Sequence, residues 1–525
     1  METQEHKRFF NYRPMLSICL FFIAGIVCVV NFYIGGIFNI IVAVTAGLCF
    51  LATFIVKLIL AKSHKVFKLV SIVCAFVVSV SLSVIFIEVY KAKPKLDGEY
   101  LINARVCERT YYSEKGKLVV TVEDIYVINY QTLEKNTVKG KMRLYLNEVD
   151  GYSLDYKLGE EITGNIDLMS LDLFSKERNN FALFNRKIYT LGFGSEEDVV
   201  SKGKINPTII EKVKNKVKAS LEDNLSADYS ELAYTMLFGD KSGLSEEIRE
   251  SYSSSGIGHL LAVSGLHVGF IVTLLAFVLK RLKANRIVIF WVIVGIVFIY
   301  ALLCGFTVSV TRAIIMTIVM LYARLRLFQY DSLSSLSVAC LIILIMNPFW
   351  IFDVGFQLSF LAVLAIIILS PVFERFFNKI FHKKLSKSLA VCLSAQIGVL
   401  PVMFKTFSTF SIFSIITNMI CIPIASIAFM ILFVTVILSL IIPQLGVLIY
   451  AFEFLMKIVT FISGFMGAIE LLKVKKWTIS LFSASLLAGG IFVSDYVFFK
   501  GKARKMLVIS SVAMVFVTFV LIFII

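Results

Sequence analysis

The feature that most constrains this chain is a long series of apolar segments, each of a length that suits a membrane. An α-helix needs roughly 17 to 25 apolar residues to cross a hydrocarbon core of about 30 Å. Of the 525 residues, 58% are hydrophobic and only 17% are charged, and the mean hydropathy is +0.85. That is more apolar surface than a water-soluble domain can bury, so the sequence predicts a polytopic α-helical membrane protein with about 11–13 spans. The expected spans are residues 15–32, 37–60, 69–89, 257–279, 287–304, 308–322, 336–345, 351–369, 389–404, 412–441, 446–469, 479–497 and 507–525.

Basic residues indicate how these spans are oriented. Lys7, Arg8 and Arg13 precede the first span and predict a cytoplasmic N-terminus, because cytoplasmic loops carry an excess of Lys and Arg. No small-residue cleavage site follows that span, so we expect it to be retained. Alternation of the spans then predicts a multi-pass protein of the bacterial inner membrane whose long polar interval and C-terminus are extracytoplasmic. Much of the formal net charge of +16 is thereby explained by topology, and it is poor evidence for a nucleic-acid partner.

The same scheme places most of the later basic clusters in the cytoplasm. These clusters are Lys57, Lys62, Lys65 and Lys68; Lys280, Arg281, Lys283 and Arg286; Arg324 and Arg326; Lys379, Lys383, Lys384 and Lys387; and Lys500, Lys502, Arg504 and Lys505. One further cluster, Lys473, Lys475 and Lys476, falls outside and is the exception to the scheme.

Composition divides the chain into four parts. We expect residues 1–90 to form three N-terminal transmembrane helices, 91–200 an inserted small all-β domain, 201–255 an amphipathic helix with connecting helices, and 256–525 the second group of transmembrane helices. Within the β part, alternation of apolar and polar residues predicts strands, at 100–109, 117–129, 139–147 and 160–169. A five-stranded barrel of the OB type fits this size and strand count.

The β domain has only a weak signal for nucleic-acid binding. OB barrels often bind single strands by stacking bases on aromatic side chains in a basic groove. Between residues 91 and 220 the chain has 22 Lys or Arg against 19 Asp or Glu, an excess too small to predict such a groove. Tyr111, Tyr112, Tyr126 and Tyr130 are candidates either for base stacking or for ordinary strand packing.

An amphipathic helix is predicted after Pro207. Its apolar stripe and its lysines are Ile209, Ile210, Val213, Val217, Leu221 and Leu225, and Lys212, Lys214, Lys216 and Lys218. Such a helix can lie on the outer leaflet, or it can pack its stripe on the barrel or on the first spans.

One long segment carries a family resemblance. From Phe238 to Phe270 the chain reads FGDKSGLSEEIRESYSSSGIGHLLAVSGLHVGF, which closely resembles the signature of the ComEC competence family. Further family stretches follow in the expected order: VTRAIIM at 310–316, NPFWIFDVGFQLSFLAV at 347–363, AQIGVLP at 395–401 and TNMICIPIAS at 417–426. The polar interval also looks like the family's extracellular OB-like domain, including LGEEITGNI at 158–166. Relatives have an NPGGFDY-like loop just beyond it, whereas this chain has Asn179, Asn180, Phe181, Ala182 and Leu183, so the role of that loop is not carried over.

The resemblance implies a function in natural transformation. Members of the family are channels that carry single-stranded DNA across the cytoplasmic membrane, which makes residues 256–525 a competence-type channel domain. It also implies an outer DNA receptor protein and a cytosolic ATPase or helicase as partners, with membrane lipid around the chain, and it is compatible with a homo-oligomer. The sequence has no GxxxxGK[ST] phosphate loop, so we expect the driving force to come from outside this chain.

The resemblance also bears on catalysis. Many relatives continue into a metallo-β-lactamase-like nuclease domain, which needs clustered His and Asp ligands for its metals. This sequence ends at Ile525 inside an apolar segment, and its last histidine is His382. We therefore expect no nuclease domain, no catalytic residue, no metal and no cofactor.

The candidate DNA path consists of polar and small residues within the spans. A charge at the centre of a span costs about 2.5 to 3.5 kcal/mol, so Arg312, Asp353 and Glu453 should face a wet cavity or a partner. Arg312 can meet a passing phosphate, or it can pair with Asp353. The proposed path residues are His259, Ser264, Gly265, His267, Arg312, Asp353, Gln357, Gln396 and Asn418, and the family's signature loop is Gly239, Asp240, Lys241 and Ser242.

The stretch GIGHLLAVSGLHVG places four glycines in one span. This predicts a helix that is either broken or closely approached by another helix. Ser264 and His267 are three residues apart, a spacing that also suits a hydrolase. A triad needs an orienting acid and an oxyanion site, and neither is evident, so packing or lining of the path is the favoured role. Two other functions remain open: an exporter or flippase of a lipid-linked or peptide substrate, and an inactive relic of a competence protein.

Overall fold

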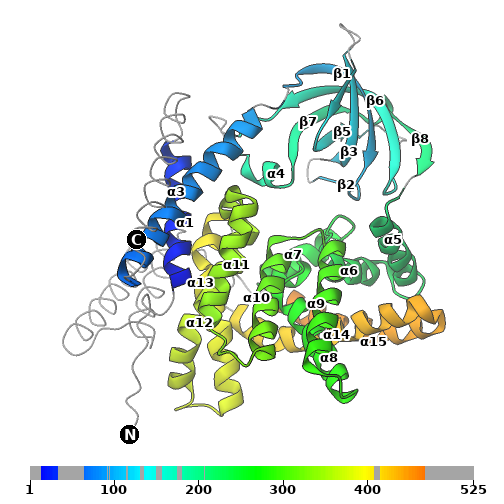
Figure 1. Ribbon diagram of the computed structural model, residues 1–525. Coiled ribbons are helices and arrows are strands. Elements are labelled where there is room, and N and C mark those ends of the chain that lie inside the picture. Colours follow the sequence, from blue (N-terminus) through cyan, green and yellow to red (C-terminus); the bar gives the residue numbers. More distant parts are fainter. Residues whose placement is uncertain are drawn as a thin grey trace, which may run out of the picture. The chain divides into compact units, whose positions relative to one another are not determined.

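The computed structural model describes residues 14–32, 64–91, 93, 95–113, 116–129, 135–148, 156–173, 180–205, 207–406 and 414–467 (Figure 1). The chain forms two compact units, which we describe separately. The membrane unit comprises Met1–Val84, Glu246–Leu432 and Ala451–Ile525, and the barrel unit comprises Ile85–Ser245 and Phe433–Tyr450.

The membrane unit is built from helices, because a helix satisfies all its backbone groups within one segment. Seven described segments are long and apolar enough to cross a membrane, consistent with the predicted polytopic class: Ser71–Lys91, Arg286–Leu303, Val308–Leu325, Val354–Phe377, Lys383–Met403, Ser414–Ser439 and Gly446–Gly467. The predicted spans at 37–60, 479–497 and 507–525 lie outside the described residues, so the number of about 11–13 spans stays a prediction.

The helices that lie wholly or partly in the membrane unit are named here with their bounds. They are α1 (Pro14–Phe32), α3 (His64–Lys91), α7 (Glu246–Ser254), η2 (Gly258–Leu261), α8 (Gly265–Arg281), α9 (Arg286–Leu303), α10 (Val308–Leu325), α11 (Ser332–Met346), η3 (Pro348–Phe352), α12 (Val354–Phe377), α13 (Lys383–Thr406), α14 (Ser414–Ile441) and α15 (Tyr450–Gly467).

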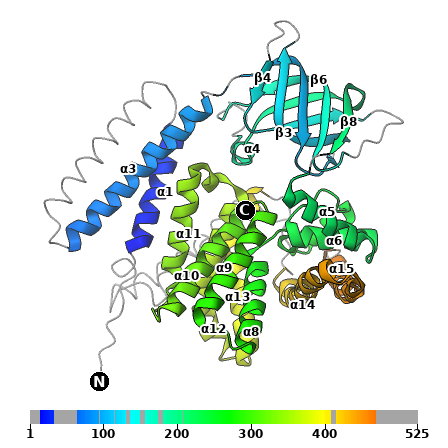
Figure 2. The ribbon, with the colours of Figure 1, turned by 45° about the vertical axis from the view of Figure 1, so that its right-hand side comes forward.

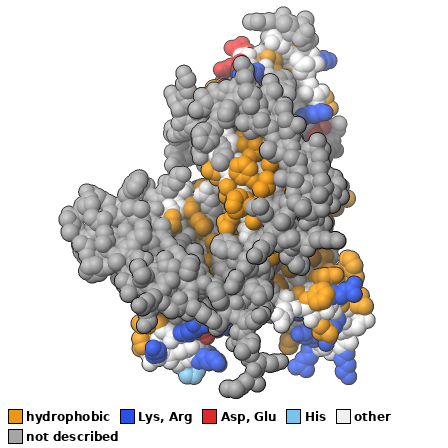
Figure 3. All heavy atoms as spheres, turned by 60° about the vertical axis from the view of Figure 1, so that its left-hand side comes forward, with side chains coloured by type: hydrophobic (Ala, Val, Ile, Leu, Met, Phe, Trp, Pro, Cys, Tyr) orange, Lys and Arg blue, Asp and Glu red, His pale blue; other side chains and the backbone are white. Residues whose placement is uncertain are grey.

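Two basic clusters share one end of the membrane unit. The α8–α9 connection carries Lys280, Arg281 and Lys283, and the α12–α13 connection carries Lys379 and neighbouring lysines. Both connections lie at the lower end of this unit in Figure 1. Figure 3 shows Lys and Arg side chains gathered at that end, below a region of hydrophobic side chains. A single basic end is what the positive-inside pattern requires of loops on the same side of a membrane.

Small residues let neighbouring helices of this unit approach closely. A Cβ added to Gly398 of α13 would lie 2.5 Å from the Cβ of Ala365 and 2.7 Å from the carbonyl oxygen of Leu361, both on α12. Glycine at this position therefore sets the separation of α12 and α13, as small residues do at helix contacts in membranes.

The barrel unit contains a closed five-stranded barrel. Its strands are β1 (Gly98–Val106), β3 (Lys117–Asn129), β5 (Lys141–Asn147), β7 (Ile188–Ser195) and β6 (Glu160–Ser170), in that spatial order, and β6 pairs again with β1. β5 and β7 are parallel, and the other pairs around the ring are antiparallel. The short strands β2 (Tyr111–Tyr112) and β4 (Lys135–Val138) pair with β3, and β8 (Val199–Ile205) pairs with β6. Figure 2 shows these strands curving around one interior, an arrangement compatible with an OB-type barrel.

The four predicted strands are confirmed as β1, β3, β5 and β6, with small corrections to their bounds. β1 covers Gly98–Val106 where 100–109 was predicted, and β6 ends one residue later than predicted, at Ser170. The strand predicted at 139–147 begins at Lys141, because Gly140, with a φ of 121°, separates it from β4. The strand that completes the ring, β7, was not predicted because Gly192 and Gly194 weaken its pattern. Both glycines face packed side chains, since a Cβ on Gly192 would lie 2.5 Å from Leu144 and 2.6 Å from Ile166.

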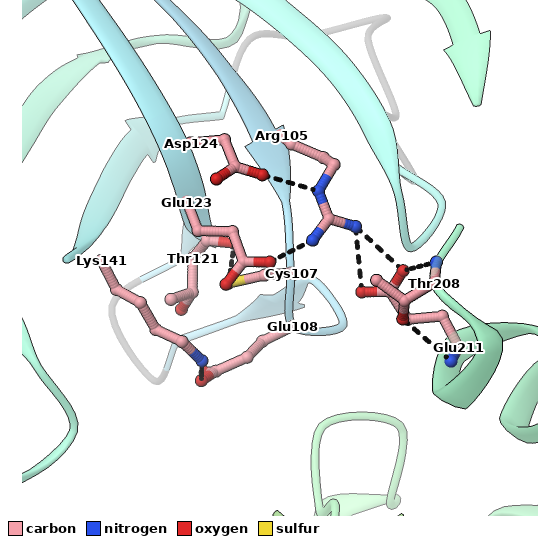
Figure 4. A network of polar contacts seen from close by, with 9 residues as sticks. All are labelled: Arg105, Cys107, Glu108, Thr121, Glu123, Asp124, Lys141, Thr208 and Glu211. Carbon is pink, nitrogen blue, oxygen red and sulfur yellow. Dashed lines mark hydrogen bonds and ion pairs between the residues drawn. The ribbon is translucent and has the colours of Figure 1, made fainter. Parts of the chain in front are cut away.

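Helix α5 (Ile209–Glu222) is attached to the barrel through Arg105 of β1. The Arg105 guanidinium donates to Glu123 and Asp124 of β3 and, at 2.9 and 3.2 Å, to both carboxylate oxygens of Glu211 (Figure 4). Glu211 also accepts from the backbone N–H of Thr208, the residue that caps α5. Val217, Leu221 and Leu225 are buried while Ile209 is 80% exposed, so the second half of the predicted stripe packs within this unit.

We predict that Arg105→Gln destabilises the attachment of α5. Glu211 and Glu123 would keep their partly buried carboxylates without a cation, and removal of one partner of a buried pair costs about 3 kcal/mol. Hydrogen exchange of the purified full-length protein should show protection of residues 209–222 falling roughly 100-fold.

The matched control is Lys95→Gln. Lys95 pairs with Asp172 at 3.2 Å, and both side chains are 67% exposed, so this pair should contribute almost nothing. Equal effects of the two substitutions on α5 would contradict the role of Arg105.

We predict that Gly398→Ala lowers the thermal denaturation midpoint of the full-length protein in detergent by several degrees. The added methyl group would meet Ala365 and the α12 backbone, and overpacking of this kind costs about 1–3 kcal/mol. Gly295→Ala in α9 is the matched control, because no heavy atom lies within 4 Å of the Cβ it adds. A midpoint that is the same in both variants would exclude close α12–α13 packing at Gly398.

Candidate polar site at the start of helix α8

The predicted break in the GIGHLLAVSGLHVG segment is confirmed. The helix α7 ends at Ser254, Gly256 has a φ of 81°, and η2 covers only Gly258–Leu261. The chain is extended at Ala262 and Ser264 and becomes α-helical again at Gly265. The expected span 257–279 is therefore continuous helix only from Gly265 onward, because the glycines and the cap interrupt the helical ladder before it.

Ser264 and His267 are brought together as a helix cap. The Ser264 hydroxyl accepts from the Leu266 N–H at 3.2 Å, and the Ser264 N–H donates to Nδ1 of His267 at 3.0 Å. This is a capping box, in which a serine and a side chain three residues later satisfy the first N–H groups of a helix. His267 is buried with its ring centroid 4.4 Å from that of Phe429 on α14. In the described residues no carboxylate is hydrogen-bonded to His267, so a triad is not formed.

Arg312 of α10 lies against the first residue of α8. A Cβ on Gly265 would be 2.6 Å from Nη2 of Arg312, so the glycine leaves the space that the guanidinium occupies. Nη1 donates to the carbonyl oxygen of Ser359 on α12, and the guanidinium carbon is 5.9 Å from the centre of the Phe360 ring. The side chain is only 6% exposed, and its Nε is buried without a hydrogen-bond partner.

The alternative pairing of Arg312 with Asp353 is wrong. Asp353 instead caps α12, where its carboxylate accepts from the Phe356 N–H at 2.9 Å. Within the described part of the chain, no carboxylate forms an ion pair with Arg312. Gln357 also has a partner near the start of α12: its Nε2 donates to the carbonyl oxygen of Ile351 in η3 at 2.9 Å.

The remaining predicted path residues are spread over other elements. His259 lies exposed on η2, and Gln396 is half-buried on α13. Asn418 of α14 is buried, and its Oδ1 has no hydrogen-bond partner. The same helix begins against the break, because a Cβ on Gly256 would lie 2.4 Å from the Cβ of Ser414.

The signature loop belongs to the barrel unit and forms a capped turn. Gly239 ends α6 (Ala227–Phe238) in the left-handed conformation, with a φ of 80°. The Asp240 carboxylate accepts from the N–H of Ser242 at 3.0 Å and from its hydroxyl at 2.6 Å, and Thr235 donates to the Asp240 carbonyl oxygen at 2.7 Å. Lys241 lies in the same turn, half-buried. These contacts give the loop a structural role in this unit.

Charged residues that the sequence did not single out hold this loop. Arg109 donates to both carboxylate oxygens of Glu231 at 2.8 and 2.9 Å, and Lys218 lies 3.4 Å from the same carboxylate. Burial raises the pKa of Glu231, but the two cations outweigh it, and the net pKa is lowered. A Cβ on Gly243, the residue that follows the loop, would meet both Glu231 and Arg109, which explains the glycine at this position. Sequence spacing gives no signal for these contacts, because Arg109 is far from Glu231 in the chain.

Several partly buried basic residues of the barrel unit are paired with carboxylates. Lys141 bonds Glu108 at 2.8 Å, beside the Arg105 network (Figure 4). Burial raises the pKa of the neighbouring Cys107 to about 12, so this thiol is unreactive at neutral pH. No group of His, Cys, Asp or Glu able to hold a metal occurs among the described residues.

The tyrosines proposed for base stacking differ in their surroundings. Tyr126 is 56% exposed on β3, whereas Tyr112 donates its hydroxyl to Glu196 at 3.0 Å. Tyr111 is half-buried, and Tyr130 lies outside the described residues. The role of these side chains in binding a strand stays a prediction.

Known proteins resemble part of this chain. The ComE operon protein 3 of Bacillus subtilis (strain 168) is 30% identical over 199 residues, which are 38% of this chain and 25% of that protein. Competence protein ComA of Neisseria gonorrhoeae is 31% identical over 138 residues, 25% of this chain and 20% of that protein. Recombination protein 2 of Haemophilus influenzae is 28% identical over 135 residues, 24% of this chain and 17% of that protein. The chain thus matches a quarter or less of the length of these relatives, and no solved structure matches it.

A family match covers a longer stretch of the chain. Residues 236–495 match the family described as Competence protein, a range that begins in α6 and includes the signature loop, the break and every described helix from α7 to α15. The family stretches between residues 238 and 426 fall in this range, whereas LGEEITGNI at 158–166 lies before it. The chain therefore belongs to the competence protein family of ComEC type.

Proposed function

We propose that this protein conducts one strand of DNA across the bacterial inner membrane during natural transformation. The observation that carries the proposal is the buried guanidinium of Arg312, which lies beside a broken helix and has no carboxylate partner among the described residues. A strand that crosses a membrane brings one negative charge per phosphate, and it needs positive or donor groups along its route. The path in this proposal includes His259, Ser264, Gly265, His267, Arg312, Asp353, Gln357, Gln396 and Asn418.

The broken segment supports a route through the membrane unit. Non-helical backbone at membrane depth is tolerated only where protein covers it or water lines it. Residues 256–264 leave the helical ladder, and α14 contacts the segment at Gly256 while the guanidinium lies at Gly265. A water-lined route at this point would give the strand polar surroundings.

The basic end of the membrane unit supports the proposed orientation. If the α8–α9 and α12–α13 connections are cytoplasmic, span alternation puts the N-terminus inside and the barrel and the C-terminus outside. Inward movement of each phosphate against an inside-negative potential of 100 mV costs about 2.3 kcal/mol. An external driving force is therefore needed, and the family resemblance makes an outer DNA receptor and a cytosolic ATPase or helicase the proposed partners.

In this proposal the chain is a conduit without catalytic residues. The Ser264–His267 pair would cap the start of α8 and would not take part in a nucleophilic reaction, since the Ser264 hydroxyl accepts from backbone N–H groups. Exported lipid-linked or peptide substrates are the competing cargo, and the experiment below separates them.

We predict that deletion of the gene abolishes entry of labelled DNA into the protected cytoplasmic fraction of competent cells. A plasmid copy of the gene should restore entry, and the lipid and peptidoglycan composition of the envelope should not change. Normal DNA entry in the deletion strain would refute the proposed function, and an altered envelope with normal entry would favour the exporter or flippase.

We predict that Ser264→Asn retains DNA entry, whereas Ser264→Ala reduces it. Asparagine caps a helix as well as serine does and adds no charge beside Arg312, and loss of the cap costs about 1 kcal/mol. A nucleophilic serine would be lost in both variants. Equal and complete loss of entry in both, at equal protein levels in the membrane, would contradict the capping role.

A further inference from the structure

The guanidinium of Arg312 has one edge engaged and one edge free. Nη1 donates to the Ser359 carbonyl oxygen. Nε and Nη2 form the other edge of the planar group, the edge that binds two oxygens of a phosphate or carboxylate side by side. Nε has no partner, and Nη2 faces Gly265 at the start of α8. The free edge is thus turned toward a helix N-terminus.

The helix N-terminus adds a second source of positive potential. The aligned peptide dipoles of α8, a helix of 17 residues, place a partial positive charge at Gly265. Acidic residues are normally favoured here, but the first turn of α8 contains none, and Asp353 caps a different helix. The Ser264 hydroxyl satisfies backbone N–H groups but brings no negative charge. A buried cation beside a positive helix end is unfavourable unless an anion is bound between them.

One side of this end of α8 is not covered by the described part of the chain. Gly265 is partly exposed, Leu266 is 37% exposed, and Gly269 one turn later is exposed with no heavy atom within 4 Å of its Cβ position. An anion can therefore approach the first turn of the helix from this side.

We propose that Arg312 and the first turn of α8 form a binding site for the oxyanion of a phosphodiester. The Nε–Nη2 edge of the guanidinium matches two non-bridging phosphate oxygens, and the partial positive charge at the helix end adds to the attraction for the anion. The assignment of this phosphodiester to a DNA strand rests on the proposed function. A phospholipid headgroup carries the same chemistry and is the other source.

The first test measures binding of a fluorescein-labelled single-stranded dT 12-mer to the full-length protein, purified in a neutral detergent. We expect Arg312→Gln to weaken binding at least tenfold and to reduce the slope of log affinity against log salt concentration by about 0.7, the value for one lost phosphate contact on a single strand. Arg312→Lys should keep most of the slope while losing affinity, because it keeps the charge and loses the two-pronged edge. A 12-mer with methylphosphonate linkages, which carry no charge, should not bind at this site.

Gly265→Ala tests the geometry without removing a charge. The added methyl group would occupy the position 2.6 Å from Nη2 and displace the guanidinium, so binding should weaken by a similar factor. Gly269→Ala adds the same group to the same helix where space is open, and Arg324→Gln removes the same charge from the exposed end of α10. Both controls should bind the 12-mer within twofold of the wild type.

Each outcome decides a separate point. Unchanged affinity and salt slope in Arg312→Gln, or equal binding of the methylphosphonate strand, would overturn the site. Binding of labelled phosphatidylglycerol that depends on Arg312, without binding of the 12-mer, would keep the oxyanion site and assign it to lipid. Normal DNA entry in the deletion strain would remove the proposed function but leave Arg312-dependent binding intact, so the two failures are distinguishable.

Discussion

The need to satisfy every backbone polar group in the membrane unit governs this structure. Amide groups in hydrocarbon find no water, so each requires a partner within the protein. Most helices meet this requirement by themselves, but the segment from Gly256 to Ser264 leaves the helical ladder. Ser264 and His267 then satisfy the first N–H groups of α8, and Ser414 and Phe429 of α14 cover the break and its cap. The first role of the polar residues at the break is therefore to satisfy the backbone groups that the break leaves without helical partners.

The two units treat their arginines differently. In the barrel unit Arg105 and Arg109 each bond carboxylates from other elements, and these pairs attach α5 and α6 to the strands. Such residues can hardly also bind a strand of DNA, which agrees with the near balance of charge in this part of the sequence. Arg312 in the membrane unit is at least as deeply buried, yet among the described residues it bonds only a carbonyl oxygen. The three arginines are therefore similarly buried, but Arg105 and Arg109 have carboxylate partners and Arg312 has none among the described residues.

Periodicity and motif spacing predict much of this fold, but only where the signal is local. Strand alternation located β1, β3, β5 and β6, and the glycines of residues 256–269 predicted the break. β7 was missed, because Gly192 and Gly194 are required by side chains of β5 and β6 that lie far away in sequence. The spacing of Ser264 and His267 indicated that they meet, yet their role as a cap depends on where α8 begins. The partners of Arg312 also come from distant helices, and no local pattern could exclude Asp353.

Stability alone does not explain the start of α8. The start of α12 shows the arrangement that stability favours, with the carboxylate of Asp353 at a positive helix end. At α8 the cap is an uncharged serine, the next residue is a glycine without which Arg312 would have no room, and the nearest charge has the wrong sign for a helix N-terminus. Departures from the rules of stability concentrate at functional sites. The serine, the glycine and the arginine form one such departure, and an anion supplied from outside the chain accounts for all three.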